Sequence, residues 1–348
     1  MSEEIQHRRS HGARGRFGSA IALCLAIGLG GSVILVSESH TEAAKVKVDH
    51  QVTKALEVAD PGAEVENYLL VGSDSRDNAD PNSPDYGGIG AADSTTGQRS
   101  DTIMILRHNR VTGEAGLLSL PRDLWVEIAG TGKHNRINSA FSKGTDVLVA
   151  TITANLGIPI NHFVQVDFNG FKQLVDAIGG VSTCFDFPTR DKHTGLMIST
   201  PGCYDLDGLQ GLQYTRSRHF EQFRDAKWRE DPTSDLGRID RQQKFIIAAL
   251  NKAVGRLSEN PYVIDDLLRA AQGAVVVDSH LDLFTIAKRF GDLVGKNLIT
   301  LQVPVYGKKI DGNDVLLLDD TKATPILDYF RGVASDPPAT TTTVAAAG

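Results

Sequence analysis

Short apolar runs separated by polar turns dominate the first half of the chain. Three of these runs predict strands at 68–71, 102–106 and 115–120. The segment 109–114 between the second and third run has the length of a hairpin turn. The segment 77–98 is rich in Gly, Asp, Asn, Ser and Pro, which indicates a surface insertion. We therefore expect the three strands to form an antiparallel meander with one long loop.

Longer periodic segments follow and alternate with further short apolar runs. The first predicted helix ends at Gly157, with Pro159 just beyond it. The expected elements are a helix at 138–156, a strand at 162–166, a helix at 169–178, a strand at 181–185, an amphipathic helix at 240–256 and mixed elements over 259–330. Strands interspersed with helices predict a single α/β domain with a mixed central sheet.

The N-terminal region has the pattern of a membrane anchor. Residues 17–37 carry no charge and are long enough to span a bilayer as a helix. Residues 1–16 contain several arginines, which places the N-terminus in the cytoplasm by the positive-inside rule and the rest of the chain outside. A cleaved signal peptide is the alternative, although its apolar region is usually shorter.

The amino-acid composition of the rest of the chain predicts the boundaries of its other segments. Residues 38–64 are expected to form a polar stalk, and 65–330 a single extracytoplasmic catalytic domain whose motifs lie within 65–255. Residues 331–348 are expected to be a disordered tail, because most of this segment consists of Pro, Thr and Ala.

The net charge excludes one class of protein, and the cysteine content predicts a disulfide. The net charge of −7 argues against a nucleic-acid binder, because no basic excess exists to neutralise phosphates over a broad face. Cys184 and Cys203 are the two cysteines beyond the predicted anchor. In an oxidising compartment they are expected to form one disulfide, since two thiols offer too few ligands for a metal site.

Polar motifs with arginine and aspartate recur at the ends of the predicted elements. They are Gly72–Arg76, Arg99–Thr102, Ser119–Asp123, Tyr214–His219 and Ser234–Gln243. Arginine binds phosphate oxygens bidentately, and paired carboxylates bind a hard divalent cation. The combination, without a nucleotide-binding glycine motif, points to phosphoryl chemistry on a substrate other than ATP.

The predicted meander brings several of these residues to one edge of the sheet. Its first strand would end at Asp74, its second would begin at Asp101 and its third would end near Arg122, with Arg76 and Arg99 alongside. Two converging carboxylates repel each other unless a cation lies between them. Asp74 and Asp101 are therefore the candidate metal ligands.

The last two motifs supply further positive charge. Arg238 and Gln242 fall at i and i+4 on one face of a helix. Arg216 and Arg218 alternate as in a strand or an extended loop, whereas Arg241 and Gln243 are expected to face water.

Each motif alone also has a structural explanation. An isolated Asp-x-Arg or Arg-x-Arg is usually a solvated surface pair. His219 is expected to be a surface residue or at most a ligand contact. Phe168 and Phe171 could line either a ligand cavity or the core, and the core is the favoured expectation.

These motifs, in this order behind one N-terminal anchor, resemble those of the LytR-CpsA-Psr family of bacterial cell-wall glycopolymer transferases. The resemblance rests on Arg99–Thr102, Leu120–Asp123, Arg216–His219 and Gly237–Gln243, and it extends more loosely to about residue 330. It implies a mixed sheet flanked by helices, with an apolar tunnel for a polyprenyl chain.

The resemblance also implies roles for individual residues. Asp74 and Asp101 correspond to ligands of Mg²⁺. The residues that correspond to pyrophosphate ligands are Arg99, Arg122, Arg216, Arg218, Arg238 and Gln242. Arg136 stands where the family often has lysine, and we expect it, with Arg76, to contact the same pyrophosphate. The paired cysteines resemble those of actinobacterial members and point to arabinogalactan or a related polymer as the donor.

The resulting hypothesis is a Mg²⁺-dependent phosphotransferase that moves a glycopolymer from a polyprenyl-pyrophosphate carrier to peptidoglycan, forming a phosphodiester. Arg122 would stabilise the developing charge. Asp123 and Asp235 are candidate bases, but orienting the arginines suits them better. Two alternatives remain open: a polyprenyl-pyrophosphate hydrolase, in which water replaces the sugar hydroxyl, and a non-enzymatic membrane-anchored regulator or lipid-binding module.

Overall fold

The computed structural model describes residues 47–59, 62–73, 100–233, 235–260, 263–271, 275–281, 298–338 and 342–343. All of them belong to one compact unit, Lys45–Gly348. The predicted anchor at 17–37 lies outside the described residues. Within the part of the chain that is described, no helix is long and apolar enough to cross a membrane.

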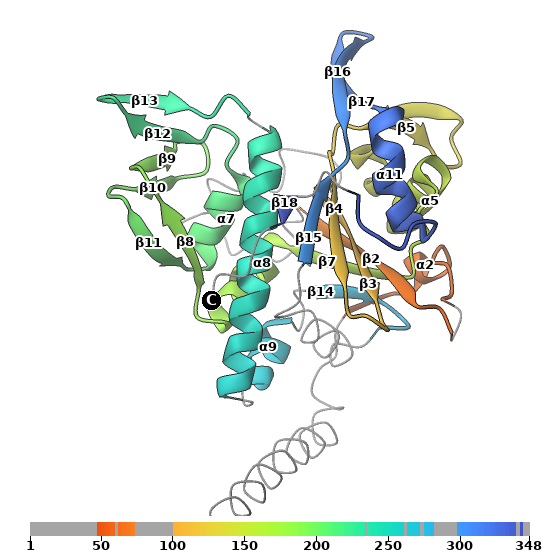
Figure 1. Ribbon diagram of the computed structural model, residues 1–348, viewed down its shortest axis with the longest axis horizontal. Coiled ribbons are helices and arrows are strands. Elements are labelled where there is room, and N and C mark those ends of the chain that lie inside the picture. The colour runs from red at the N-terminus through yellow and green to blue at the C-terminus, as the bar shows by residue number, and fades with distance from the viewer. Residues whose placement is uncertain are drawn as a thin grey trace, which may run out of the picture. The chain divides into compact units, whose positions relative to one another are not determined.

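An eight-stranded mixed sheet forms the centre of this unit (Figure 1). In spatial order its strands are β1 (Lys47–Asp49), β14 (Val275–Asp278), β7 (His162–Asp167), β2 (Val65–Ser73), β3 (Ser100–Asn109), β4 (Ala115–Leu120), β15 (Leu298–Gln302) and β18 (Thr342–Thr343). Strands β2, β3 and β4 pair antiparallel, which confirms the predicted meander. Strand β7 runs parallel to β2, and β15 runs parallel to β4.

Helices cover both faces of the sheet. The helices of the fold are α2 (His50–Thr53), α4 (Asn138–Phe141), α5 (Thr145–Leu156), α6 (Phe168–Ala177), α7 (Gly208–Arg216), α8 (Asp235–Glu259), α9 (Val263–Ala271) and α11 (Asp320–Arg331). One face packs on α2, α4, α5 and α11, and the other on α8 and α9. The prediction of an α/β fold with a mixed sheet flanked by helices is confirmed.

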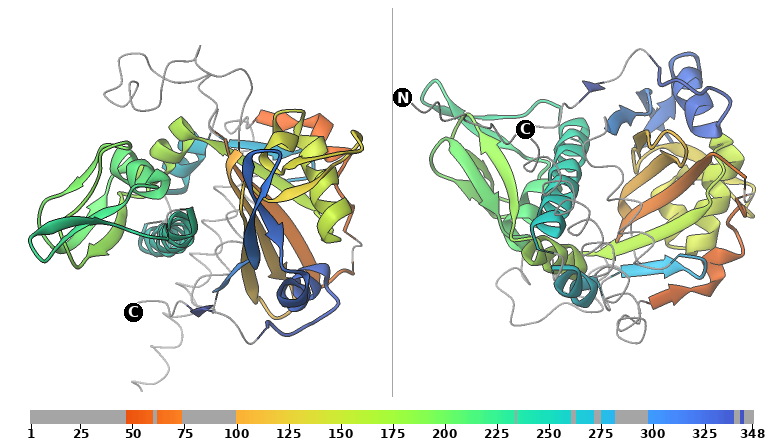
Figure 2. Two further views of the ribbon diagram at one scale, coloured as in Figure 1. Left: turned by 90° about the horizontal axis from the view of Figure 1, so that it is seen from above. Right: turned by 60° about the horizontal axis from the view of Figure 1, so that its bottom comes forward.

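A smaller set of strands lies on the far side of α8 from the main sheet. They are β8 (Val181–Phe185), β9 (Thr189–Asp191), β10 (Leu196–Ile198), β11 (Gly202–Leu206), β12 (Glu221–Arg224) and β13 (Lys227–Glu230). Helix α8 contacts β4 of the main sheet, and it also contacts α7 and β8 (Figure 2). We call α7 and β8–β13 the small lobe. The long helix α8 therefore joins the sheet to the small lobe, and α6, which contacts β7 and α7, does so as well.

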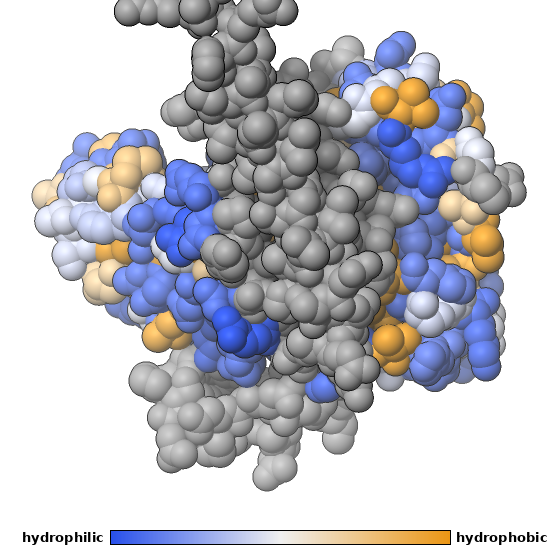
Figure 3. All heavy atoms as spheres, turned by 90° about the horizontal axis from the view of Figure 1, so that it is seen from below, coloured by the Kyte–Doolittle hydropathy of each residue, from blue (hydrophilic) through white to orange (hydrophobic). Residues whose placement is uncertain are grey.

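Two hairpins complete the described elements, and they lie near α5 and α11 (Figure 1). They are β5 (Trp125–Ile128) with β6 (Lys133–Arg136), and β16 (Val305–Ile310) with β17 (Asn313–Leu318). On the face drawn in Figure 3, the described surface is mainly hydrophilic, with scattered hydrophobic residues.

Helix α11 packs closely on the sheet because β4 carries a glycine beneath it. A Cβ atom on Gly116 would lie 2.8 Å from Cε1 of Tyr329. On neighbouring β3, the buried guanidinium of Arg107 lies over the same ring, 4.0 Å from its centroid. A larger residue at position 116 would therefore displace the tyrosine and the helix.

Several elements differ from their predicted form. The helix expected at 138–156 is two helices, α4 and α5, which are separated by Gly144 with φ of 152°. Residues 47–59, expected in a polar stalk, contribute β1 and α2, with Val52 fully buried in the core. In the tail expected to be disordered, Thr342 and Thr343 instead pair with β15.

Cys184 and Cys203 form the predicted disulfide. The two residues lie directly opposite each other on the antiparallel strands β8 and β11. The bond links positions 19 apart in the sequence, so it closes a short loop of the small lobe.

Replacing both cysteines by serine should lower the free energy of unfolding by about 3 kcal/mol, because the open loop gains entropy in the unfolded chain. Chemical denaturation of the variant, compared with the oxidised and reduced wild type, measures this difference. Reduced wild type should match the variant, whereas equal midpoints for all three samples would contradict the expectation.

Candidate functional site

The ends of five described strands meet at one edge of the sheet. Strand β2 ends at Ser73, which is paired with Ser100 at the start of β3. Strands β4, β7 and β15 end at the same edge, since β7 is parallel to β2 and β15 is parallel to β4. The sequence reasoning therefore identified the correct edge for Arg122, which follows β4.

The candidate metal ligands lie largely beyond the described residues. Asp74, Arg76 and Arg99 are outside them, and for Asp101 only the backbone at the start of β3 is described. No group of three His, Cys, Asp or Glu side chains that could hold a metal ion occurs among the described residues. The metal assignment to Asp74 and Asp101 stays a prediction.

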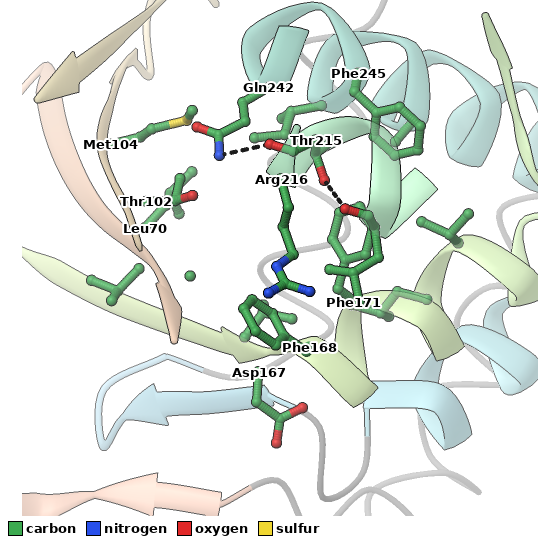
Figure 4. A pocket seen from close by; sticks show the side chains of 18 of the residues that line it. Leu70, Thr102, Met104, Asp167, Phe168, Phe171, Thr215, Arg216, Gln242 and Phe245 are labelled. Atoms are coloured by element: carbon green, nitrogen blue, oxygen red, sulfur yellow. Dashed lines mark hydrogen bonds between the residues drawn. The ribbon is translucent and has the colours of Figure 1, made fainter. Parts of the chain in front are cut away.

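A cavity of about 730 Å³ opens at this edge. The interior is apolar, and it is formed by one face of the sheet together with α6, α8 and α9. Its apolar lining includes Leu70, Met104, Leu117, Val164, Val166, Phe168, Phe171, Leu174, Phe245, Ala249, Leu250, Ala253 and Leu267 (Figure 4). Phe168 and Phe171 line this cavity, which is the alternative to the favoured expectation of a place in the core.

Four arginines from separate parts of the chain line the same cavity: Arg122, Arg216, Arg218 and Arg238. Gln242 lies on α8 one turn after Arg238 and lines the cavity as well. The structure therefore brings together five of the eight residues predicted to bind pyrophosphate. Four positive charges beside an apolar cavity suit a ligand with an anionic head and a hydrocarbon tail.

Arg216 is held in place by an aromatic ring. It is the last residue of α7, where a positive charge interacts favourably with the helix dipole. Its guanidinium carbon lies 4.5 Å from the centroid of the Phe168 ring, and the two side chains face each other in Figure 4. The sequence predicted a strand or an extended loop here. That prediction is wrong for Arg216, which is helical, while Arg218 follows the helix end.

Asp123 and Arg136 lie beside the cavity and not in its lining. Asp123 forms ion pairs with Arg122 at 3.5 Å and with Arg136 at 3.3 Å. Arg136 also donates a hydrogen bond to the carbonyl of Asp314. Asp123 thus orients two arginines, as the sequence reasoning favoured. Arg136 is not among the residues that line the cavity, and the side chain of Asp235 is outside the described residues.

Three consecutive residues of α8 fix the cavity mouth. Arg241 donates to the carbonyl of Ser217, Gln242 donates to the carbonyl of Thr215, and Gln243 donates to Ser119 Oγ and the Leu301 carbonyl. Arg241 and Gln243 were expected to face water, and this expectation is wrong because both are at most 6% exposed. The spacing of these residues in the sequence cannot reveal that they are buried, since α8 has protein on two sides.

Arg241 is itself anchored by an acid. It forms an ion pair with Asp231 at 2.9 Å and stacks on the ring of Phe220. Burial alone would raise the pKa of Asp231, but hydrogen bonds from Thr233 and Arg241 outweigh it and hold that pKa below its usual value.

Asp191 is a residue of the site that the sequence reasoning missed. It lies at the end of β9, is fully buried and lines the cavity. It accepts hydrogen bonds from Ser217 Oγ at 2.6 Å and from the backbone N–H groups of His193, Thr194 and His219. It therefore holds the segment that carries Arg216 and Arg218. No motif surrounds it, and its main partner is 26 positions away.

The charge of Asp191 is stabilised by these donors. Burial alone would raise its pKa, but the hydrogen bonds from Ser217 and from three backbone N–H groups hold the pKa below the usual value of 3.8.

Comparison with known proteins places the chain in one family. Residues 33–329 match the model of the LytR_cpsA_psr family. The chain is 32% identical over 327 residues to a probable cell wall biosynthesis protein LcpB from Corynebacterium glutamicum, covering 91% of this chain and 72% of LcpB.

A second relative is the polyisoprenyl-teichoic acid–peptidoglycan teichoic acid transferase TagU from Bacillus cereus. It is 34% identical over 214 residues, which are 61% of this chain and 65% of TagU. Among solved structures, a LytR-Csp2A-Psr enzyme from Actinomyces oris matches with a TM-score of 0.58 and 22% identity, over 82% of this chain and 96% of the other. That likeness shows the fold.

Replacing Asp191 with asparagine should destabilise the protein by about 2–4 kcal/mol at neutral pH, because the amide turns an N–H group toward buried donors. The carboxylate has a depressed pKa in the folded state, so its stabilising effect is present above about pH 4 and is lost as the pH falls further. The difference in unfolding free energy between wild type and Asp191→Asn should therefore shrink in acid.

Urea denaturation at a series of pH values measures this difference. Asp186→Asn, which changes an exposed carboxylate in the same region, is the matched control and should stay close to wild type throughout. A destabilisation of Asp191→Asn that did not change with pH would contradict the assigned role of the charge.

Proposed function

The chain belongs to the LytR-CpsA-Psr family, and on this premise we propose that it transfers a glycopolymer from a polyprenyl-pyrophosphate carrier to peptidoglycan. One observation carries the proposal: four arginines lie together in the lining of a cavity that is otherwise mostly apolar. A polyprenyl pyrophosphate has matching chemistry, with a charged head and a long hydrocarbon chain. The name of the relative TagU describes transfer of teichoic acid to peptidoglycan, which supports the same reaction class.

In the proposed reaction the arginines act on the pyrophosphate. Arg122, Arg216, Arg218 and Arg238 bind its oxygens and neutralise the charge that builds on the departing lipid phosphate. The acceptor hydroxyl attacks the sugar-linked phosphorus, the bond from phosphorus to the bridging oxygen breaks, and the lipid leaves as its monophosphate. The product is a phosphodiester between glycopolymer and wall.

A divalent cation at the sheet edge is a further part of the proposal. Strands β2 and β3 are paired at Ser73 and Ser100, next to Asp74 and Asp101 in sequence. Two carboxylates on adjacent strand ends suit a hard cation. We propose that Asp74 and Asp101 hold Mg²⁺, which when bound would neutralise further charge on the pyrophosphate.

The cellular setting is part of the same proposal. Residues 17–37 would anchor the chain in the cell membrane, with the catalytic domain outside. The disulfide Cys184–Cys203 suits that oxidising compartment. The resemblance of this cysteine pair to actinobacterial members supports arabinogalactan or a related polymer as the donor.

Arg122→Ala should reduce transfer by at least about 100-fold, because an arginine that stabilises transition-state charge contributes several kcal/mol. The full chain in detergent is incubated with a labelled polyprenyl-pyrophosphate glycan, nascent peptidoglycan and Mg²⁺, and the label bound to peptidoglycan is measured. Arg269→Ala, which changes an exposed arginine on α9, is the control and should keep wild-type transfer. Phosphate release without attachment would favour the hydrolase, and tight lipid binding without turnover would favour the binding module.

Ala249→Trp should block the cavity to a long polyprenyl chain, since Ala249 lies on its apolar wall. Transfer from a long-chain donor should fall about tenfold or more, while transfer from a donor with a short lipid should be largely retained. Lys244→Trp is the matched control, because Lys244 is exposed on the same helix. Equal losses with long and short donors would contradict lipid binding in this cavity.

A further inference from the structure

The proposed transfer requires the acceptor hydroxyl to lose its proton, and the described carboxylates at the cavity are committed to other tasks. Asp123 is paired with two arginines and lies outside the lining. Asp191 accepts hydrogen bonds from four donors. Asp167 caps α6, where its side chain accepts from the N–H of Gly170. A carboxylate that already accepts from cations or N–H groups is a poor proton acceptor.

Two histidines line the same cavity beside the arginines. His219 directly follows Arg218, and His193 lies in the turn between β9 and β10. Their ring centroids are 4.2 Å apart. The side chain of His219 is 53% exposed, so it is open to an incoming substrate while still forming part of the cavity lining.

The hydrogen bonding of His219 defines which ring nitrogen can react. Its Nδ1 lies 2.7 Å from Oε1 of Glu230 on β13. An ionised carboxylate only accepts hydrogen bonds, so in the neutral ring the proton resides on Nδ1. The other nitrogen, Nε2, then carries a lone pair and can accept a proton.

We propose that His219, oriented by Glu230, is the general base that takes the proton from the acceptor hydroxyl. This rests on the proposed transferase function. In this step the hydroxyl proton passes to Nε2, the hydroxyl oxygen bonds to the sugar-linked phosphorus, and the bond to the bridging oxygen breaks with its electrons on the lipid phosphate. Glu230 stabilises the imidazolium that forms, and Glu230 does not itself take up the proton.

The surroundings keep the ring in position. Asp191 on β9 accepts from the backbone N–H of His219, which fixes the start of the β12 segment. The ring is packed against His193 from the β9–β10 turn, and Glu230 approaches from β13. Arg218 precedes it in the chain. In Figure 1 the β12–β13 hairpin lies near the N-terminal end of α8, which carries Arg238.

The test measures transfer by the full chain in detergent with variants of the two partners. His219→Ala should lower kcat by about 100-fold or more, because a positioned base typically contributes that much. Glu230→Gln should lower kcat by about tenfold with KM unchanged. Binding of a polyprenyl-pyrophosphate donor should be unchanged in both. Both side chains are more than half exposed, so folding should be unaffected, which thermal denaturation checks.

Two readouts separate a base from a structural residue. Added imidazole should restore a measurable part of the activity of His219→Ala and none of the activity of Arg122→Ala. The acid limb of the wild-type pH–rate profile should be absent in His219→Ala.

Glu221→Gln is the matched control for Glu230→Gln. Glu221 lies on the same hairpin, but its partner is Arg190 at 2.6 Å, whereas the partner of Glu230 is His219. The Glu221→Gln variant should transfer glycopolymer at the wild-type rate. The proposal would be overturned if His219→Ala transferred at the wild-type rate. It would also be overturned if imidazole restored the activity of His193→Ala and not that of His219→Ala. Absence of transfer by the wild type would instead refute the proposed function.

Discussion

The site depends on one helix that joins two parts of the fold through buried hydrogen bonds. Gln243 of α8 binds Ser119 Oγ and the Leu301 carbonyl, next to the sheet edge that carries Arg122. Arg241 and Gln242 bind the carbonyls of Ser217 and Thr215, on either side of Arg216. The bond from the charged Arg241 contributes roughly 1.5–3 kcal/mol, and each bond from a neutral glutamine amide contributes roughly 0.5–1.5 kcal/mol. They help to set the separation between Arg122, after β4, and Arg216 and Arg218, at the end of α7, and pyrophosphate needs both sets together.

The same helix also builds the apolar half of the site. Its side chains Phe245, Ala249, Leu250 and Ala253 face the sheet across the cavity. A hydrocarbon tail in this space and a pyrophosphate at the arginines make one continuous ligand path. The two parts of the substrate would therefore lie in different parts of the cavity. The apolar chain is buried inside, and the reacting phosphorus lies at the mouth, where the arginines compensate its charge.

Sequence patterns correctly predicted the features that depend on neighbouring residues in the chain. The meander β2–β4 and the sheet edge bearing Arg122 followed from apolar runs and turn lengths, and Arg238 and Gln242 followed from helical spacing. Other features depend on contacts between distant segments. Asp191 was missed because its partner Ser217 is brought close only by the small lobe. Arg241 and Gln243 were misplaced because α8 is covered on two sides. The sequence did not decide between core and cavity for Phe168 and Phe171, because an apolar side chain looks the same in the sequence in either place.

The central claim is that one ligand occupies both the arginine-lined mouth and the apolar cavity. A crystal structure of the protein with a polyprenyl pyrophosphate and Mg²⁺ tests it most directly. The account predicts both phosphates within hydrogen-bonding distance of Arg122, Arg216, Arg218 and Arg238, with the isoprenoid chain between α8 and the sheet. A lipid bound elsewhere, or phosphates away from these four arginines, would contradict it.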